Sequence, residues 1–137
     1  MKTKLIVALI IAISFGGFAQ DQVIGIYFTP EKDGKIQIYK EGNKYFGKII
    51  SIPNNNRKDD KNPDEKLRSR SVIGLVLLQN FEYKNGQWQN GTIYDVDSGT
   101  LYSSTLWFDG NDLKKLNLRG FVGISLFGRT ATLERVP

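Results

Sequence analysis

The chain has 137 residues, of which 40% are hydrophobic and 12% aromatic, with 19 basic and 14 acidic side chains and no histidine or cysteine. The missing residue types exclude histidine-based catalytic triads, cysteine nucleophile pairs, the usual zinc sites and disulfide bonds. The formal net charge of +5 is spread over both signs, which argues against nucleic acid as a partner.

Residues 1–19 have the pattern of a secretory signal peptide. A basic start is followed by an apolar run over residues 5–13 and by small residues at positions 17 and 19. The apolar run is shorter than the ~20 residues that a membrane-spanning helix needs. We therefore expect cleavage after Ala19, no transmembrane segment afterwards, and a periplasmic or extracellular protein. No cysteine is present for lipid attachment. Cleavage leaves one domain, residues 20–137, whose 17 basic and 14 acidic side chains give a net charge of +3.

The first half of the domain predicts three strands. Residues 23–29 are rich in β-branched and aromatic side chains and stop at Pro30. Residues 35–40 alternate between polar and apolar side chains, and residues 44–52 resume the strand after the turn Glu-Gly-Asn at 41–43. This pattern is typical of a β-hairpin.

Residues 53–70 form a long polar segment that predicts a loop. Asn62 as N-cap, Pro63 in the first helical position and Glu65 three residues after the cap predict a short helical turn over residues 63–67. Two interpretations of the loop remain open. It is either a recognition surface or a solvated loop held by local ion pairs. The charged residues that both interpretations involve are Asp64, Glu65, Arg68 and Arg70.

The second half of the domain predicts the remaining strands. Residues 72–78 are apolar on both faces, so they form either a buried strand or part of a helical lid, and the β-branched residues and Gly74 favour a strand. This predicted strand continues through residues 81–83. Residues 87–94 and 100–108 form a hairpin, and residues 113–122 and 129–136 close the chain. Eight or nine regularly spaced strands predict an all-β, antiparallel barrel or sandwich. Apolar residues on both faces favour a small barrel with a filled or ligand-bearing interior.

Several ordered motifs resemble a bacterial family of secreted proteins catalogued as domain of unknown function 2147. The motifs are Lys-Tyr-Phe-Gly-Lys-Ile at 44–49, Asn-Pro-Asp-Glu-Lys-Leu-Arg-Ser-Arg at 62–70, Gly-Thr-Ile-Tyr-Asp at 91–95, Leu-Arg-Gly-Phe at 118–121 and Gly-Arg-Thr at 128–130. The resemblance implies a lipocalin-like or fatty-acid-binding-like β-barrel and carries no established activity. The chain departs from the family pattern at Tyr27, where many members have tryptophan, and at Ser71, where many have proline.

Arg119 and Arg129 flank the glycine-interrupted apolar segment 118–130. We expect both side chains to point inward near a barrel end. By analogy with lipocalin-like barrels, Arg129 would stack on Tyr27 or Trp107 as a structural cation–π contact. The alternative is that either arginine binds a ligand carboxylate inside the barrel. These four residues are the predicted ligand contacts.

The remaining motifs give little support to catalysis. The spacing of Asp95 and Asp97 does not match a calcium loop, so no metal site is predicted. Asp95 beside Tyr94 or Tyr102 would support acid–base chemistry only if burial shifted its pKa. No catalytic residue and no cofactor are predicted.

Two functional hypotheses follow. The first is a non-enzymatic barrel that binds a small apolar or amphipathic molecule in its interior. The second is an envelope interaction or scaffolding module with a closed barrel, in which the loop 53–70 contacts a partner protein.

Overall fold

The computed structural model describes residues 19–122 and 124–137, except for the side chains of residues 121–129. The predicted signal peptide therefore lies almost wholly outside the described residues. Among those described, no helix is long and apolar enough to cross a membrane.

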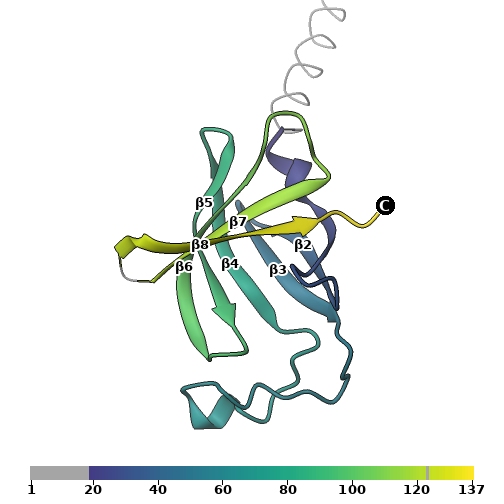
Figure 1. The fold of residues 1–137 in the computed structure, drawn as a ribbon, viewed down its shortest axis with the longest axis vertical. Helices are drawn as coiled ribbons and strands as arrows, with labels where there is room; N and C mark the ends of the chain where they lie inside the picture. The colour runs from purple at the N-terminus through teal and green to yellow at the C-terminus, as the bar shows by residue number, and fades with distance from the viewer. Residues whose placement is uncertain (1–18, 123) are drawn as a thin grey trace, which may run out of the picture.

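The described chain forms one antiparallel sheet of eight strands in which each strand pairs with the next along the sequence (Figure 1). The strands are β1 (Gly25–Phe28), β2 (Lys35–Glu41), β3 (Lys44–Ser51), β4 (Val76–Lys84), β5 (Gln87–Asp95), β6 (Thr100–Phe108), β7 (Lys115–Val122) and β8 (Ile124–Glu134). The last strand returns to the first through a bridge between Tyr27 and Arg135, and the Val136 N–H donates to the Ile26 carbonyl over 2.8 Å. The predicted all-β lipocalin-like barrel is confirmed, and it is nearly closed.

The structure differs from the sequence prediction at residues 72–75. These residues form a turn, in which Gly74 has φ +88° and its N–H donates to the Ile49 carbonyl, and β4 begins only at Val76. Glycine alone adopts this backbone conformation easily. The predicted helical turn is present as a 3₁₀ turn, η2 (Glu65–Leu67). Its N-cap is Asp64, whose side chain accepts from the Lys66 N–H, instead of Asn62.

The inner face of the sheet carries the hydrophobic core. Large side chains are accommodated over glycines on neighbouring strands. A Cβ atom on Gly91 would lie 2.4 Å from the ring of Phe81, and one on Gly47 would lie 2.7 Å from Leu78. Both large side chains are essentially inaccessible to solvent. Glycine at these positions therefore leaves space inside the barrel that the large side chains of the neighbouring strand occupy.

The barrel has two different ends (Figure 1). One end has the β2–β3, β4–β5 and β6–β7 turns together with a 3₁₀ turn, η1 (Asp21–Val23), and we call it the closed end. The other end has the β5–β6 turn and the long segment that joins β3 to β4, and we call it the loop end.

Candidate functional site

Arg135 holds the closed end together. Its guanidinium lies over the ring of Tyr27 at 4.9 Å and over that of Phe108 at 5.8 Å. It also donates hydrogen bonds to the carbonyl oxygens of Gln22, Ile24 and Leu113. A Cβ atom on Gly25 would lie 2.6 Å from this guanidinium, so a side chain there would displace the end of Arg135 from its present position. One side chain thus joins the N-terminal segment, the β6–β7 turn and the end of the chain.

Three further side chains bind the N-terminal segment across the closed end. The Trp88 Nε1–H donates to the Gln20 carbonyl over 3.0 Å, and the Tyr45 hydroxyl donates to the Asp21 carboxylate over 2.7 Å. The Tyr27 hydroxyl donates to the Val23 carbonyl over 2.9 Å. Burial raises the pKa of Tyr27 to about 12, against an opposing effect of the nearby Arg135 charge. The two tyrosine hydroxyls stay protonated at neutral pH and keep donating these hydrogen bonds, which hold the N-terminal segment across the closed end.

Asp59 is the centre of a polar cluster at the loop end. Its side chain is 0% exposed, and it accepts hydrogen bonds from the Tyr94 hydroxyl at 2.6 Å, the Asn62 amide at 2.8 Å and Arg70 Nε at 2.8 Å. Burial alone would raise the pKa of Asp59, but these three hydrogen bonds together with the Arg70 charge lower it. Burial and the hydrogen bond to Asp59 raise the pKa of Tyr94 to about 12. The cluster anchors the loop to β5 and keeps an ionised carboxylate inside the protein.

The charged loop residues predicted from the sequence are only partly brought together. Arg70 belongs to the Asp59 cluster, and Arg68 Nε donates to the Asn62 carbonyl over 2.7 Å. Asp64 caps η2. Glu65 is exposed, and its Oε1 lies 3.9 Å from Arg68 Nη1. Both arginines therefore stabilise the conformation of the loop. The recognition role of the four residues stays a prediction.

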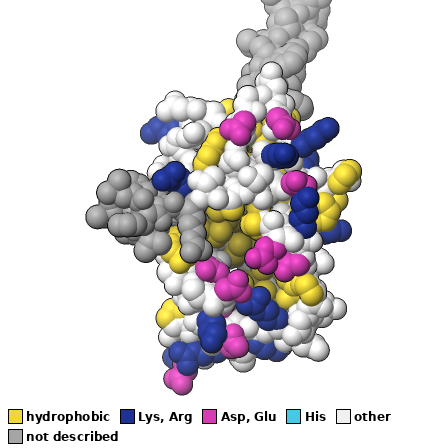
Figure 2. All heavy atoms as spheres, viewed as in Figure 1, with side chains coloured by type: hydrophobic (Ala, Val, Ile, Leu, Met, Phe, Trp, Pro, Cys, Tyr) yellow, Lys and Arg dark blue, Asp and Glu magenta, His cyan; other side chains and the backbone are white. Residues whose placement is uncertain are grey.

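The interior is not filled equally along its length. Toward the closed end, the inward residues Trp88, Leu106 and Leu116 are at most 2% exposed. Toward the loop end, Ile93 and Tyr102 remain partly accessible. These two share the inner face, because a Cβ on Gly120 would contact both at 3.7 Å, an ordinary van der Waals distance. Figure 2 shows a hollow with hydrophobic side chains at its floor, between β8 and the long loop. Among the described side chains, the interior is therefore less completely buried next to the loop end than at the closed end.

Ser104 of β6 lies in the wall of this part of the interior. It is paired with Gly91 of β5 and Gly120 of β7, so no neighbouring side chain covers it within its row of the sheet. Its side chain is 2% exposed, and its Oγ has no hydrogen-bond partner among the described residues. A buried hydroxyl without a partner is unusual in proteins.

The predicted ligand contacts do not form one site. Arg119 pairs with Thr105 and Thr130 and follows Leu118, which points inward. Because side chains alternate along a strand, Arg119 points to the outer face. The predicted inward orientation of Arg119 is therefore wrong. Trp107 is also out of step with Leu106 and lies half-buried on the outer face.

Tyr27 is buried at the closed end, where the arginine over its ring is Arg135. The side chain of Arg129, the residue predicted for that position, lies outside the described residues. Any role of these four residues in ligand binding stays a prediction.

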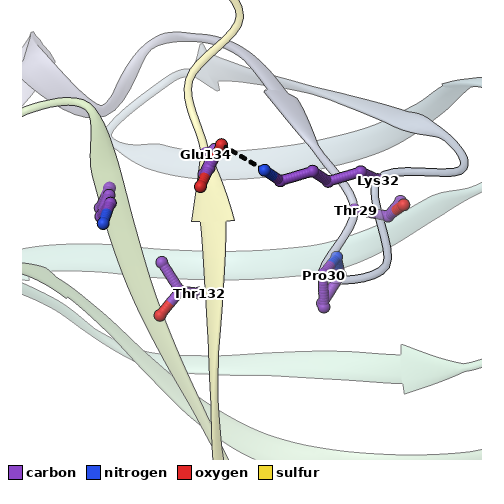
Figure 3. A pocket seen from close by; sticks show the side chains of 6 residues that line it. Thr29, Pro30, Lys32, Thr132 and Glu134 are labelled. Atoms are coloured by element: carbon purple, nitrogen blue, oxygen red, sulfur yellow. Dashed lines mark ion pairs between the residues drawn. The ribbon is translucent and has the colours of Figure 1, made fainter.

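A second hollow lies between the β1–β2 connection and the ends of β7 and β8, and it has a volume of about 310 Å³. Figure 3 shows Lys32 reaching across it to Glu134, with 3.0 Å between Nζ and Oε2. Thr29, Pro30 and Thr132 line the same pocket. Both charged side chains are largely exposed, and an ion pair of this kind contributes ~0–1 kcal/mol. The pocket is a surface groove, separate from the barrel interior.

The described carboxylates bear on the metal and acid–base chemistry considered from the sequence. No group of three or more carboxylates among them is arranged to hold a metal ion. Asp95, the acid considered from the sequence, accepts from the Asp97 N–H over 3.0 Å and from the Ser98 hydroxyl over 2.9 Å. Both bonds lie within its own hairpin turn. The carboxylate that bonds to Tyr94 is Asp59, which the sequence interpretation missed.

Similarity to known proteins supports the fold and shows the family of the chain. No match was found among curated proteins. A solved structure from Helicobacter pylori, described as "Protein HP1028 from the human pathogen Helicobacter pylori belongs to the lipocalin family", is 24% identical with a TM-score of 0.72, and the match covers 84% of this chain and 83% of that one. This similarity supports the fold. Residues 25–135 match the family described as "Uncharacterized protein conserved in bacteria (DUF2147)". Because the match spans nearly all of the barrel, the chain belongs to the DUF2147 family.

Proposed function

We propose that the protein binds a small apolar or amphipathic molecule in the barrel interior next to the loop end. The observation that carries the proposal is the partial accessibility of Ile93 and Tyr102, which point into the barrel, beside the sealed core of the closed end. Ligand sites in proteins are concave, mostly apolar and commonly located in the mouths of β-barrels. The lipocalin-like fold is compatible with such a site.

We propose further that binding takes place in the periplasm or outside the cell. The support is the sequence of residues 1–19, with its basic start, apolar run and small residues before the expected cleavage position. N-terminal sequencing of the protein recovered from a periplasmic or secreted fraction should begin at Gln20. Recovery in the cytoplasm with Met1 or Lys2 at the N-terminus would contradict the proposal.

The proposed interior site is tested by a larger side chain at position 120, which would occupy it. A Cβ there would meet side-chain atoms of Ile93 and Tyr102 at 3.7 Å, an ordinary contact, so the first atom fits and a larger side chain would take up the space between Ile93 and Tyr102. The probe is N-phenyl-1-naphthylamine, whose fluorescence rises in apolar sites. The unmodified protein should bind it with 1:1 stoichiometry, and Gly120→Leu should abolish binding while retaining a cooperative thermal transition.

The matched control is Ser103→Leu, which adds the same side chain to the outer face of β6, where Ser103 is exposed. This variant should bind the probe as the unmodified protein does. Absence of probe binding by the unmodified protein, or equal binding by Gly120→Leu, would contradict an interior site.

A further inference from the structure

We infer that the interior ligand ends in a hydrogen-bonding group, a hydroxyl or a carbonyl, which pairs with Ser104 Oγ. This inference rests on the proposed function and names the chemistry that the site selects. Ser104 is 2% exposed, and its hydroxyl has no partner among the described residues.

The surroundings of Ser104 place its side chain on the inner face. Its strand partner Gly91 has its inward side against the ring of Phe81, and its other partner, Gly120, has its inward side toward Ile93 and Tyr102. Directly paired residues on neighbouring strands share a face, so the side chain of Ser104 is directed inward with them.

The packing beside this hydroxyl differs over the two glycines. Phe81 fills the space over Gly91, whereas the nearest atoms to a Cβ on Gly120 are at 3.7 Å. The hydroxyl of Ser104 is covered in the free structure, and the packing beside it is looser on the β7 side, which also faces the partly accessible Ile93 and Tyr102. An apolar body lying along these residues would bring its polar end to Oγ.

A ligand with a polar end is energetically favoured over a wholly apolar ligand. A buried hydroxyl without a partner is unfavourable to folding, and an apolar ligand would leave it unpaired. A ligand with one donor or acceptor at that position removes the penalty. A site that hydrogen-bonds a substrate hydroxyl discriminates against the analogue that lacks it.

The test compares dodecan-1-ol with dodecane as displacers of N-phenyl-1-naphthylamine from the unmodified protein and from Ser104→Ala. The alanine variant should bind the alcohol about fivefold more weakly, the effect of one hydrogen bond of ~1 kcal/mol, and should bind dodecane unchanged. Without ligand, its melting temperature should rise by a few degrees, because the unpaired hydroxyl is gone.

Ser103→Ala is the matched control, since it removes a hydroxyl from the outer face of the same strand. Ser103 and Ser104 both line a groove of about 380 Å³ beside Asn90 and Thr92. The inference is overturned if Ser104→Ala changes alcohol and alkane binding equally or not at all, or if Ser103→Ala alone weakens alcohol binding. If the unmodified protein does not bind the fluorescent probe, the proposed interior site itself fails.

Discussion

Replacing Arg135 with alanine should destabilise the closed end strongly. The substitution removes three hydrogen bonds to the carbonyls of Gln22, Ile24 and Leu113, and two cation–π contacts. Each hydrogen bond contributes ~1 kcal/mol net, and the two ring contacts of this half-buried side chain add ~1 kcal/mol together. The expected loss in the free energy of unfolding is therefore about 3–4 kcal/mol, or on the order of 10 °C in melting temperature.

Urea unfolding followed by tryptophan fluorescence measures this loss, because Trp88 packs against the ring of Phe108 at the closed end. Arg57→Ala is the matched control. Arg57 pairs with the exposed Asp97 on the surface, and an exposed ion pair contributes ~0–1 kcal/mol. Arg135→Lys keeps the charge but offers fewer donors in a different geometry, so it should recover less than half of the loss. A loss for Arg135→Ala no larger than that for Arg57→Ala would refute the assignment of this residue.

Three further predictions concern the barrel wall and the loop end. Gly91→Ala should cost about 1–3 kcal/mol, because its Cβ would overlap the ring of Phe81, whereas Gly120→Ala should be tolerated; comparing their urea midpoints checks this contrast. Tyr94→Phe removes the 2.6 Å hydrogen bond to Asp59 and should cost ~1–2 kcal/mol, and an unchanged urea midpoint would argue against the bond.

The last of the three is acid sensitivity. The folded pKa of Asp59 lies below its unfolded value, so its stabilising effect is complete above pH ~4 and is lost as pH falls through the folded pKa. Asp59→Asn should therefore be less stable at pH 7 by about 2–3 kcal/mol, with the difference shrinking below pH ~4. Melting curves between pH 2 and 7 test this, and a constant difference would contradict it.

Local features of the sequence predicted the fold well. The hairpin turn at 41–43 and the hairpin between β5 and β6 depend on residues close together in the chain, and alternation identifies the strands on either side. Residues 72–75 were predicted incorrectly because an apolar run has no alternation to separate a strand from a buried turn. There the positive φ of Gly74 decides the structure.

The contacts at the two ends could not be predicted in the same way. The Asp59–Tyr94 bond joins residues 35 positions apart, and the bond from Arg135 to Gln22 spans 113 positions. These contacts depend on the register of the closed barrel, which no local pattern specifies. Arg129 was therefore chosen for the position over Tyr27 that Arg135 occupies.

The sequence alone could have identified Ser104 as an unusual inward residue. It stands in the inward row of β6 with Tyr102, Leu106 and Phe108, so period-two alternation marks it as a polar residue in an apolar row. What alternation does not show is whether such a hydroxyl finds a partner. That depends on the glycines opposite it, Gly91 and Gly120, and on the packing of Phe81 over only one of them.

Native mass spectrometry tests the interior site most directly. The protein should be purified gently from its own cells and measured intact, and then measured again after denaturation. We predict an excess mass of one small molecule that is released on unfolding. This molecule should have an apolar body and a hydroxyl or carbonyl end. A mass equal to that of the chain alone in both measurements, together with no uptake of N-phenyl-1-naphthylamine, would contradict it.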